Sequence, residues 1–334
     1  MRALVTGATG FIGRRLIGEL LRAGDSVTAL VRSEAQDLPI GVATRPASME
    51  DGVEHLTTCM RGHDIVYHLA ARVSFNPAES AELLRVNAEG TRRILAAACQ
   101  AGVRRSVIVS SACTMGISHD PSVVLDEDSP LDPLLVRRNP YLASKLAAER
   151  HALEAVDRGQ WVTIVNPTTV FGTGDRSLNS GTLVRQVAQA RIIPVPSGGS
   201  NVIDIDDVVA GIRAAARRGR AGVRYILGGA NLRFREIIEH IAHVIERRPI
   251  IVPMPAAARR PMMAAAWLIQ WITGSRLLTP QIVGDTFSYK FYSCRRAELE
   301  LSWRARRSFT ATLADAWEYY LREGLIALPS RATA

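Results

Sequence analysis

The side chains with the clearest chemical potential are Tyr141 and Lys145, in the segment Tyr141-Leu-Ala-Ser-Lys145. A spacing of four places both side chains on one face of a helix, one turn apart. A tyrosine with a pKa of about 10 is a poor acid–base catalyst at neutral pH unless its phenolate is stabilised, and a neighbouring ammonium stabilises it. The pair therefore predicts proton transfer to or from an oxygen atom of a small molecule.

The identity of Lys145 is informative in itself. The chain has 41 basic residues, and only Lys145 and Lys290 are lysines. A compact ammonium can reach a hydroxyl group and the neighbourhood of the tyrosine in a way that a wide guanidinium cannot. A lysine at this position thus favours a specific chemical role.

Ser110 and Ser111 end a Val/Ile-rich run and precede Tyr141 by about 30 residues. A hydroxyl group there can hydrogen-bond a substrate carbonyl or carbinol oxygen while Tyr141 transfers the proton. A serine at the end of a strand is often only a turn residue, so this prediction depends on Tyr141 and Lys145.

A glycine-rich segment, Gly7-Ala8-Thr9-Gly10-Phe11-Ile12-Gly13, lies between a strand-like run and a helical pattern. Gly7 permits a tight turn, Gly10 lets the backbone approach a pyrophosphate, and Gly13 lets the helix pack close to the strand. The helix N-terminus offers free N–H groups and a partial positive charge to phosphates. The segment predicts a dinucleotide site.

The end of the second strand-like run distinguishes the two nicotinamide dinucleotides. An NAD site normally has a carboxylate there, which binds the ribose 2′-hydroxyl, whereas this chain reads Leu30-Val31-Arg32-Ser33. Arg32 can pair with a 2′-phosphate, so the sequence favours NADP(H) over NAD. The alternative is that Arg32 is one more surface arginine in an arginine-rich chain.

The first 170 residues contain the elements that must position these groups. Strands are predicted at 3–6, 26–31, 64–71, 106–111 and 161–167, and helices at 11–24, 80–101 and 141–158. Nearly continuous Val/Ile/Leu strands between helices indicate a parallel sheet covered on both faces, so the fold class is α/β with a doubly wound, Rossmann-type sheet. Helices without strands between them are expected after residue 170, forming a smaller, mainly helical substrate domain. The approximate division is 1–170 and 171–330, and some later strands can return to the first domain.

Composition narrows the class of protein. The formal charge is +9 and the pI about 9.9, but the arginines are scattered, which indicates a basic solvated surface, with attraction to an anionic membrane or cofactor as the alternative. Nucleic acid is not an expected partner, since no binding module is recognisable. Four well-separated cysteines argue against a disulfide framework and a structural zinc site and favour a reducing compartment. Since no secretory signal is apparent, a cytoplasmic location is expected.

The most apolar stretch, 261–273, has 13 residues, whereas a transmembrane helix needs about 20. We expect no transmembrane span. The stretch fits a buried helix, and the alternatives are a peripheral membrane contact or the entrance for a lipid-like substrate.

Taken together, the motifs TGATGFIG (6–13), DIVYHLAA (64–71), VNAEGT (86–91), VSSA (109–112), YLASK (141–145) and NPTTVFGTGD (166–175) resemble those of the extended short-chain dehydrogenase/reductases, in the family's order and over essentially the whole chain. The resemblance implies a catalytic group of Ser111, Tyr141 and Lys145 supported by Asn87, and a homodimer would be common in that family. The residues expected to bind the cofactor are Gly7, Thr9, Gly10, Phe11, Ile12, Gly13, Arg32, Leu69, Ala70, Ala71, Tyr141, Lys145, Asn166, Pro167 and Val170.

Departures from the family pattern refine the expectation. The aspartate that touches adenine in the family would fall near Pro46, where this chain has none. Sugar-nucleotide epimerases of the family carry an arginine that grips a diphosphate, and here Ser200 takes its place and Asp204 replaces a histidine. Losing a charge-assisted clamp argues against nucleotide sugars. The chain looks closer to the dihydroflavonol-reductase and 3β-hydroxysteroid-dehydrogenase-like branch.

The sequence thus predicts an NADP-dependent oxidoreductase acting on a carbonyl or alcohol of a fairly apolar small molecule. An epimerase of a sugar-like substrate with tightly bound NAD is the alternative, since it uses the same catalytic group. The residues after Ser111 (Ala112, Cys113, Thr114 and Met115) lack the acidic pair of a dehydratase. A dinucleotide-sensing protein without activity is disfavoured because Tyr141 and Lys145 are both present.

Overall fold

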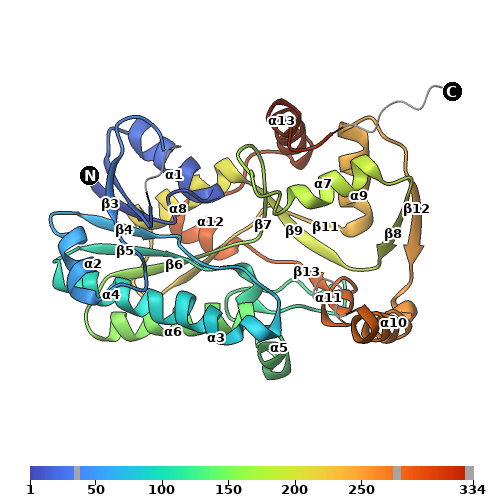
Figure 1. The fold of residues 1–334 in the computed structure, drawn as a ribbon, viewed down its shortest axis with the longest axis horizontal. Coiled ribbons are helices and arrows are strands. Elements are labelled where there is room, and N and C mark those ends of the chain that lie inside the picture. Colours follow the sequence, from blue (N-terminus) through green and yellow to red (C-terminus); the bar gives the residue numbers. More distant parts are fainter. Residues whose placement is uncertain (34–37, 274–279, 328–334) are drawn as a thin grey trace.

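A seven-stranded parallel sheet forms the larger lobe of the molecule (Figure 1). The computed structural model describes residues 1–33, 38–273 and 280–327. The strands in spatial order are β10 (Arg224–Leu227), β6 (Val162–Pro167), β5 (Arg105–Val109), β4 (Ile65–His68), β1 (Arg2–Thr6), β2 (Ser26–Val31) and β3 (Ala43–Pro46). The strand order reverses between β1 and β4, which is the point where ligands bind in such sheets, outside the carboxyl ends of the strands.

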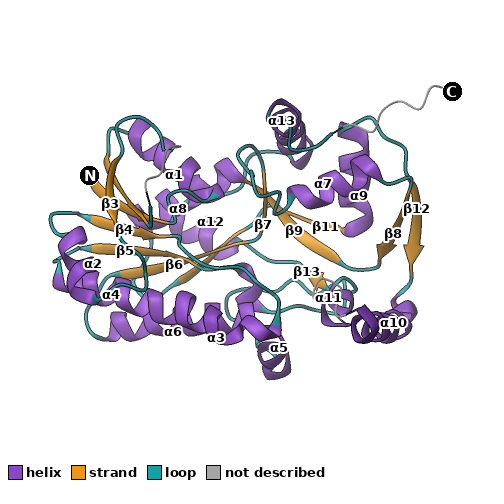
Figure 2. Cartoon of the chain, viewed as in Figure 1, coloured by secondary structure: helices purple, strands orange, loops and turns teal. Residues whose placement is uncertain are grey.

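Helices cover both faces of this sheet (Figure 2). One face carries α1 (Phe11–Arg22), α8 (Ile205–Arg218) and α12 (Arg295–Leu301), and the other α2 (Val53–Met60), α4 (Gly90–Gln100) and α6 (Pro140–Asp157). Successive strand residues point to opposite faces. Leu4 accordingly packs in a cluster with Leu56 and Ile94, whereas Val5 packs in a cluster with Leu16 and Val208. Both strand residues are fully buried, so the sheet fixes the positions of the loops at its edge.

The smaller lobe has two sheets of its own. β9 (Gly199–Asp204) pairs with β7 (Thr169–Phe171), β11 (Ala230–Arg233) and β13 (Tyr289–Lys290), and β8 (Ile192–Pro196) pairs with β12 (Ile250–Met254). The helices of this lobe are α7 (Gly181–Gln189), α9 (Phe234–Val244), α10 (Arg259–Thr273), α11 (Pro280–Asp285) and α13 (Phe309–Arg322). Its core includes Phe171, Val187, Ile241 and Tyr320.

The five strands predicted before residue 170 are present, and the parallel, doubly wound sheet is confirmed. The edge strand β3 was not predicted, because its four residues are exposed and include Arg45 and Pro46. The expectation of helices without strands after residue 170 is wrong, since six strands, β8 to β13, lie there among the described residues. One of them, β10, returns to the main sheet beside β6.

The stretch predicted as one helix at 80–101 is helical but irregular. It consists of α3 (Ser80–Leu83), a π-helical turn (Leu84–Glu89) and α4. Single π-turns inside helices frequently occur at functional sites, and this one contains Asn87.

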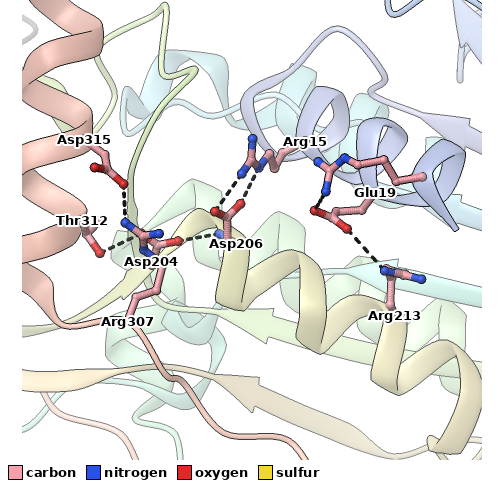
Figure 3. Close-up of polar contacts among 9 residues, drawn as sticks. Arg15, Glu19, Asp204, Asp206, Arg213, Arg307, Thr312 and Asp315 are labelled. Carbon is pink, nitrogen blue, oxygen red and sulfur yellow. Dashed lines mark hydrogen bonds and ion pairs between the residues drawn. The ribbon is translucent and has the colours of Figure 1, made fainter.

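A polar network joins the two lobes beside the first helix (Figure 3). Arg15 of α1 forms a bidentate ion pair with Asp206, and the Asp206 backbone N–H donates to the side chain of Asp204, the N-cap of α8, at 2.7 Å. Asp204 also accepts a hydrogen bond from Thr312 of α13 at 2.7 Å and pairs with Arg307 at 3.1 Å. Burial raises the pKa of Asp204. These carboxylates serve to connect elements.

Candidate active site

The glycine-rich loop lies between β1 and α1, as its sequence indicates. Gly7 has a φ of 68°, and a Cβ atom there would lie 2.6 Å from the backbone nitrogen of Ala70. A Cβ on Gly13 would collide with the carbonyl oxygen of Gly7. Gly10 is the N-cap of α1, and the first turn of the helix contains no acidic residue. The loop therefore holds backbone against backbone and leaves the helix N-terminus favourable for an anion.

A cavity of about 470 Å³ opens beside this loop. Seven of the predicted cofactor residues line it, namely Gly7, Thr9, Gly10, Arg32, Leu69, Ala70 and Ala71. Phe11, Ile12 and Gly13 are not on its wall. The wall also includes Ala47, Ser48 and Met49. These residues directly follow Pro46, near which the sequence lacks the aspartate that touches adenine in the family. The size and place of the cavity, and a cradle that a Cβ would fill, fit a dinucleotide.

Charge at the outer end of the cavity is mixed. Arg32 and Ser33 at the end of β2 line the cavity, and both are exposed. Glu50 also lines the cavity, and it forms an ion pair with Arg85. The Glu50 charge therefore already has a partner.

Helix α6 carries the predicted catalytic pair. The Asn139 side chain caps the helix by accepting a hydrogen bond from the Leu142 backbone at 3.0 Å, and Pro140 follows at the first helical position. This arrangement favours a helix start directly before Tyr141. The ammonium of Lys145, one turn further on, donates to the carbonyl oxygen of Val109 at the end of β5, 3.0 Å away.

The electrostatics of the pair follow from burial. Burial raises the pKa of Tyr141, repulsion from Cys113 in its thiolate form acts in the same direction, and hydrogen bonding to Ser111 acts in the opposite direction. Burial lowers the pKa of Lys145 to about 8, against the opposing effects of Cys113 and Glu149. At neutral pH the site thus holds a protonated tyrosine, able to donate a proton, beside a cationic lysine.

Asn87 links the cofactor side of the site to this helix. Its amide nitrogen donates to Ser144 Oγ at 3.0 Å and to the Arg72 carbonyl at 2.9 Å, and its Oδ1 accepts from the Arg72 backbone at 2.8 Å. Ser144 in turn donates to the carbonyl of Tyr141 at 2.8 Å. Asn87 and Lys145 also line a small enclosed cavity together with Ala70 and Ala71. Since the same two alanines line the larger cavity, Asn87 and Lys145 lie next to the predicted cofactor residues Ala70 and Ala71, whereas Ser111 and Tyr141 line neither of these two cavities.

The remaining predicted cofactor residues lie elsewhere. Pro167 ends β6 and is buried, and Val170 in β7 is half-buried against the main core. Asn166 is fully buried and its amide nitrogen donates to the Ser111 carbonyl at 3.1 Å. None of the three lines either of these two cavities.

Glu149 is a buried acid at this site that the sequence reasoning missed. Its Oε1 accepts hydrogen bonds from Ser110 Oγ, from Asn166 Nδ2 at 2.7 Å and from Thr114 Oγ1 at 2.9 Å. These donors belong to the ends of β5 and β6 and to the turn that follows Ser111. The carboxylate thus ties the Ser111 turn to the catalytic helix. The signal was present in the sequence, since Tyr141, Lys145 and Glu149 follow one another at intervals of four.

An aromatic side chain packs against Tyr141. The Phe75 ring lies edge-on to the Tyr141 ring, with 5.8 Å between centroids, and Phe75 and Val73 are both exposed. Burial raises the pKa of Cys113 to about 11, so the Cys113 thiol is neutral at neutral pH.

The turn after Ser111 is also anchored from the C-terminal part of the chain, since the Tyr292 hydroxyl donates to the Gly116 carbonyl at 2.9 Å.

Comparisons with known proteins agree with this geometry. The model of the "NAD dependent epimerase/dehydratase family" matches residues 3–228. A Synechocystis sp. protein provisionally named dihydroflavonol 4-reductase is 32% identical over 342 residues, covering 96% of this chain and 95% of the relative. "Sterol demethylase protein B" of Methylococcus capsulatus is 32% identical over 246 residues, covering 72% of this chain and 73% of the relative. The solved structure "MoeE5 in complex with UDP-glucose and NAD" superposes with a TM-score of 0.76 and 26% identity, over 97% of this chain and 99% of that one.

Proposed function

The chain belongs to the NAD-dependent epimerase/dehydratase family, as an extended short-chain dehydrogenase/reductase, and from this premise we propose that it is an NADP(H)-dependent oxidoreductase of apolar carbonyl compounds or alcohols. An oxidoreductase with a nicotinamide dinucleotide is what the family and its members indicate. Our proposal adds the NADP(H) preference, the apolar substrate and the roles of the individual residues.

The observation that carries the proposal is the wall that the two cavities share. Ala70 and Ala71 line both the cavity at the glycine-rich loop and the enclosed cavity at Lys145. A dinucleotide held by Gly7, Thr9 and Gly10 would therefore reach the catalytic helix. When bound, the nicotinamide supplies or accepts the hydride.

The protein's own groups handle the proton and the oxygen. Ser111 Oγ hydrogen-bonds the substrate oxygen, and Tyr141 Oη donates a proton to it during reduction or withdraws one during oxidation. Lys145 stabilises the phenolate that remains and binds a ribose hydroxyl. Asn87 and Glu149 hold the two sides of this arrangement in place through the hydrogen bonds described above.

The NADP(H) preference rests on the end of β2. Arg32 lies on the cavity wall, and the residues Leu30 to Ser33 include no carboxylate to receive a ribose 2′-hydroxyl. A guanidinium suits the geometry of a 2′-phosphate. The two acids that line this cavity, Glu50 and Glu82, are already paired, with Arg85 and Arg72 respectively.

Two features support an apolar substrate: the aromatic ring beside Tyr141, and the replacement of the residues with which epimerases of the family bind a diphosphate. Phe75 packs against Tyr141. Ser200, at the position of the epimerases' diphosphate-binding arginine, lies buried and hydrogen-bonded to Thr169 at 2.8 Å, and Asp204 binds Arg307. Two relatives bear names of enzymes that act on a flavonoid or a sterol.

The structural similarity to a protein with UDP-glucose and NAD favours one second candidate, an epimerase that retains NAD. The two functions differ in what a turnover assay shows. We expect NADPH consumption in the presence of apolar ketones or aldehydes, abolished in Tyr141→Phe. No consumption with such compounds, together with NAD released from the denatured protein, would replace the reductase by the epimerase.

The remaining expectations stay part of the proposal. All four cysteines are unpaired, in keeping with a cytoplasmic enzyme. We retain 1–170 as the cofactor domain and 171–330 as the substrate domain, with β10 returning to the first. A homodimer is also proposed, and its test is the molar mass in solution.

A further inference from the structure

Helix α10 presents an apolar face to the outside of the molecule. On its inner side Ala266 is buried against Val283 and Phe287. On its outer side Trp267, Leu268, Ile269 and Trp271 are 59%, 48%, 41% and 74% exposed. A surface helix normally places charged side chains outward, but the charged residues of α10 are confined to its first turn. The helix expected at 261–273 is thus present, but it is buried on its inner side only.

The adjacent two-stranded sheet is apolar on its outer face as well. Ile193 and Val195 of β8 point into the core of the smaller lobe. Ile192 of β8 and Ile250 and Val252 of β12 are exposed, as the alternation of strand side chains requires. β12 leads through Ala256–Ala258 directly into α10, and both elements lie at the end of the molecule away from the main sheet (Figures 1 and 2). We call the exposed side chains of these elements the distal apolar surface, namely Ile192, Ile250, Val252, Trp267, Leu268, Ile269 and Trp271.

The chain segment that carries most of this surface is basic, and Glu239 and Glu246, which precede it in the sequence, line one pocket together with Arg248 and Ile251. Between Glu246 and Asp285 there is no aspartate or glutamate, and the same stretch contains five arginines. Of the arginines next to the surface, Arg191, Arg248 and Arg260 are exposed. Such a combination of apolar and basic groups complements an anionic lipid headgroup layer above an apolar interior.

From this we propose that the distal apolar surface docks on an anionic bilayer, with α10 lying in the plane of the interface. Tryptophans are typical of the headgroup level. None of the helices in the described residues is long and apolar enough to cross a membrane, so α10 would rest on the surface. The proposal does not depend on the reaction that the enzyme performs.

Charge decides against a second copy of the chain as the occupant. A two-fold contact brings the same patch of both subunits together. Here it would bring the arginines of the two subunits close together, and the 247–284 stretch contains no acidic residue to pair with them. Glu246, just outside that stretch, lines the same pocket as Arg248 of its own subunit, and like charges at an interface oppose association. An anionic bilayer offers the opposite charge over the whole surface.

The test is sedimentation of the purified full chain with lipid vesicles. We expect binding to vesicles of phosphatidylglycerol and phosphatidylcholine, weak binding to phosphatidylcholine alone, and release by high salt. The double substitution Trp267→Ser and Trp271→Ser should weaken binding at least tenfold. Leu299→Ser is the matched control, because Leu299 is 71% exposed on α12 in the other lobe, and its binding should equal that of the wild type.

A second pair of variants separates charge from apolar contact. Arg248→Gln with Arg260→Gln should also weaken binding. Arg61 and Arg158 are exposed at the C-terminal ends of α2 and α6, in the other lobe, so Arg61→Gln with Arg158→Gln removes the same charge elsewhere and should leave binding nearly unchanged. Equal binding by wild type and the tryptophan variant, or no binding by either, would overturn the proposal. So would a wild-type dimer that becomes a monomer on the tryptophan substitutions, since the surface would then join two copies.

Discussion

Replacing the catalytic lysine, Lys145→Met, is expected to stabilise the protein while abolishing its activity. The folded protein holds the pKa of Lys145 at about 8, against an ordinary value of 10.5. At about 1.4 kcal/mol for each tenfold change in proton affinity, the buried charge costs about 3 kcal/mol of folding free energy at pH 7. Methionine fills similar space without the charge. It loses the hydrogen bond to the Val109 carbonyl, worth about 1 kcal/mol, so the variant should gain about 2 kcal/mol.

The pH dependence of this gain makes the prediction specific. The unfolded chain keeps the Lys145 proton up to its ordinary pKa of 10.5, whereas the folded protein releases it above about 8. The cost of the charge is therefore full below the folded pKa and disappears as the pH rises toward the unfolded one. Guanidinium unfolding of both proteins without added nucleotide should show the variant's advantage at pH 7 shrinking to near zero by about pH 10. A variant that is less stable at pH 7, by an amount independent of pH, would refute the buried cation.

Three further substitutions test separate parts of the site. Tyr141→Phe should lower turnover at least 100-fold, the order expected for losing a proton donor, while nucleotide affinity, measured by titration, changes little. Gly7→Ala should weaken nucleotide binding at least about tenfold, because the added Cβ would collide with the Ala70 backbone nitrogen at a position with a positive φ. Unchanged affinity would mean that the loop does not hold the nucleotide. Glu149→Gln removes a charge that raises the pKa of Lys145, so the alkaline limb of the kcat/KM profile should move to lower pH, and an unmoved limb would limit Glu149 to a structural role.

The sequence predicted those parts of the molecule whose determinants are local. The glycine-rich loop connects its own strand and helix, and the cap Asn139 immediately precedes the catalytic helix. Each of these signals lies within a dozen residues, so the pattern alone was sufficient. Asn87 donates a hydrogen bond to Ser144 of the catalytic helix, and the supporting role that the family resemblance implies for it stays a prediction.

What the sequence missed depends on distant contacts or on exposure. β8 contains two prolines and alternates buried with exposed apolar residues, so it does not read as a core strand. β10 became part of the main sheet through pairing with β6, some 60 residues earlier in the chain. The role of Glu149 depends on hydrogen-bond donors at the ends of β5 and β6, and sequence periodicity cannot show that these donors lie near it. An apolar helix such as α10 has the same pattern whether its outer face is buried or bare.

The central claim, an NADP(H)-exchanging enzyme with Arg32 as the phosphate ligand, is tested most directly by titrating dialysed protein with NADPH and with NADH. We predict that NADPH binds at least tenfold more tightly, and that Arg32→Ser removes this preference without weakening NADH. Because Arg32 is exposed, the variant should fold normally. Tighter binding of NADH by the wild type, or NAD that dialysis does not remove, would contradict the account and place the epimerase first.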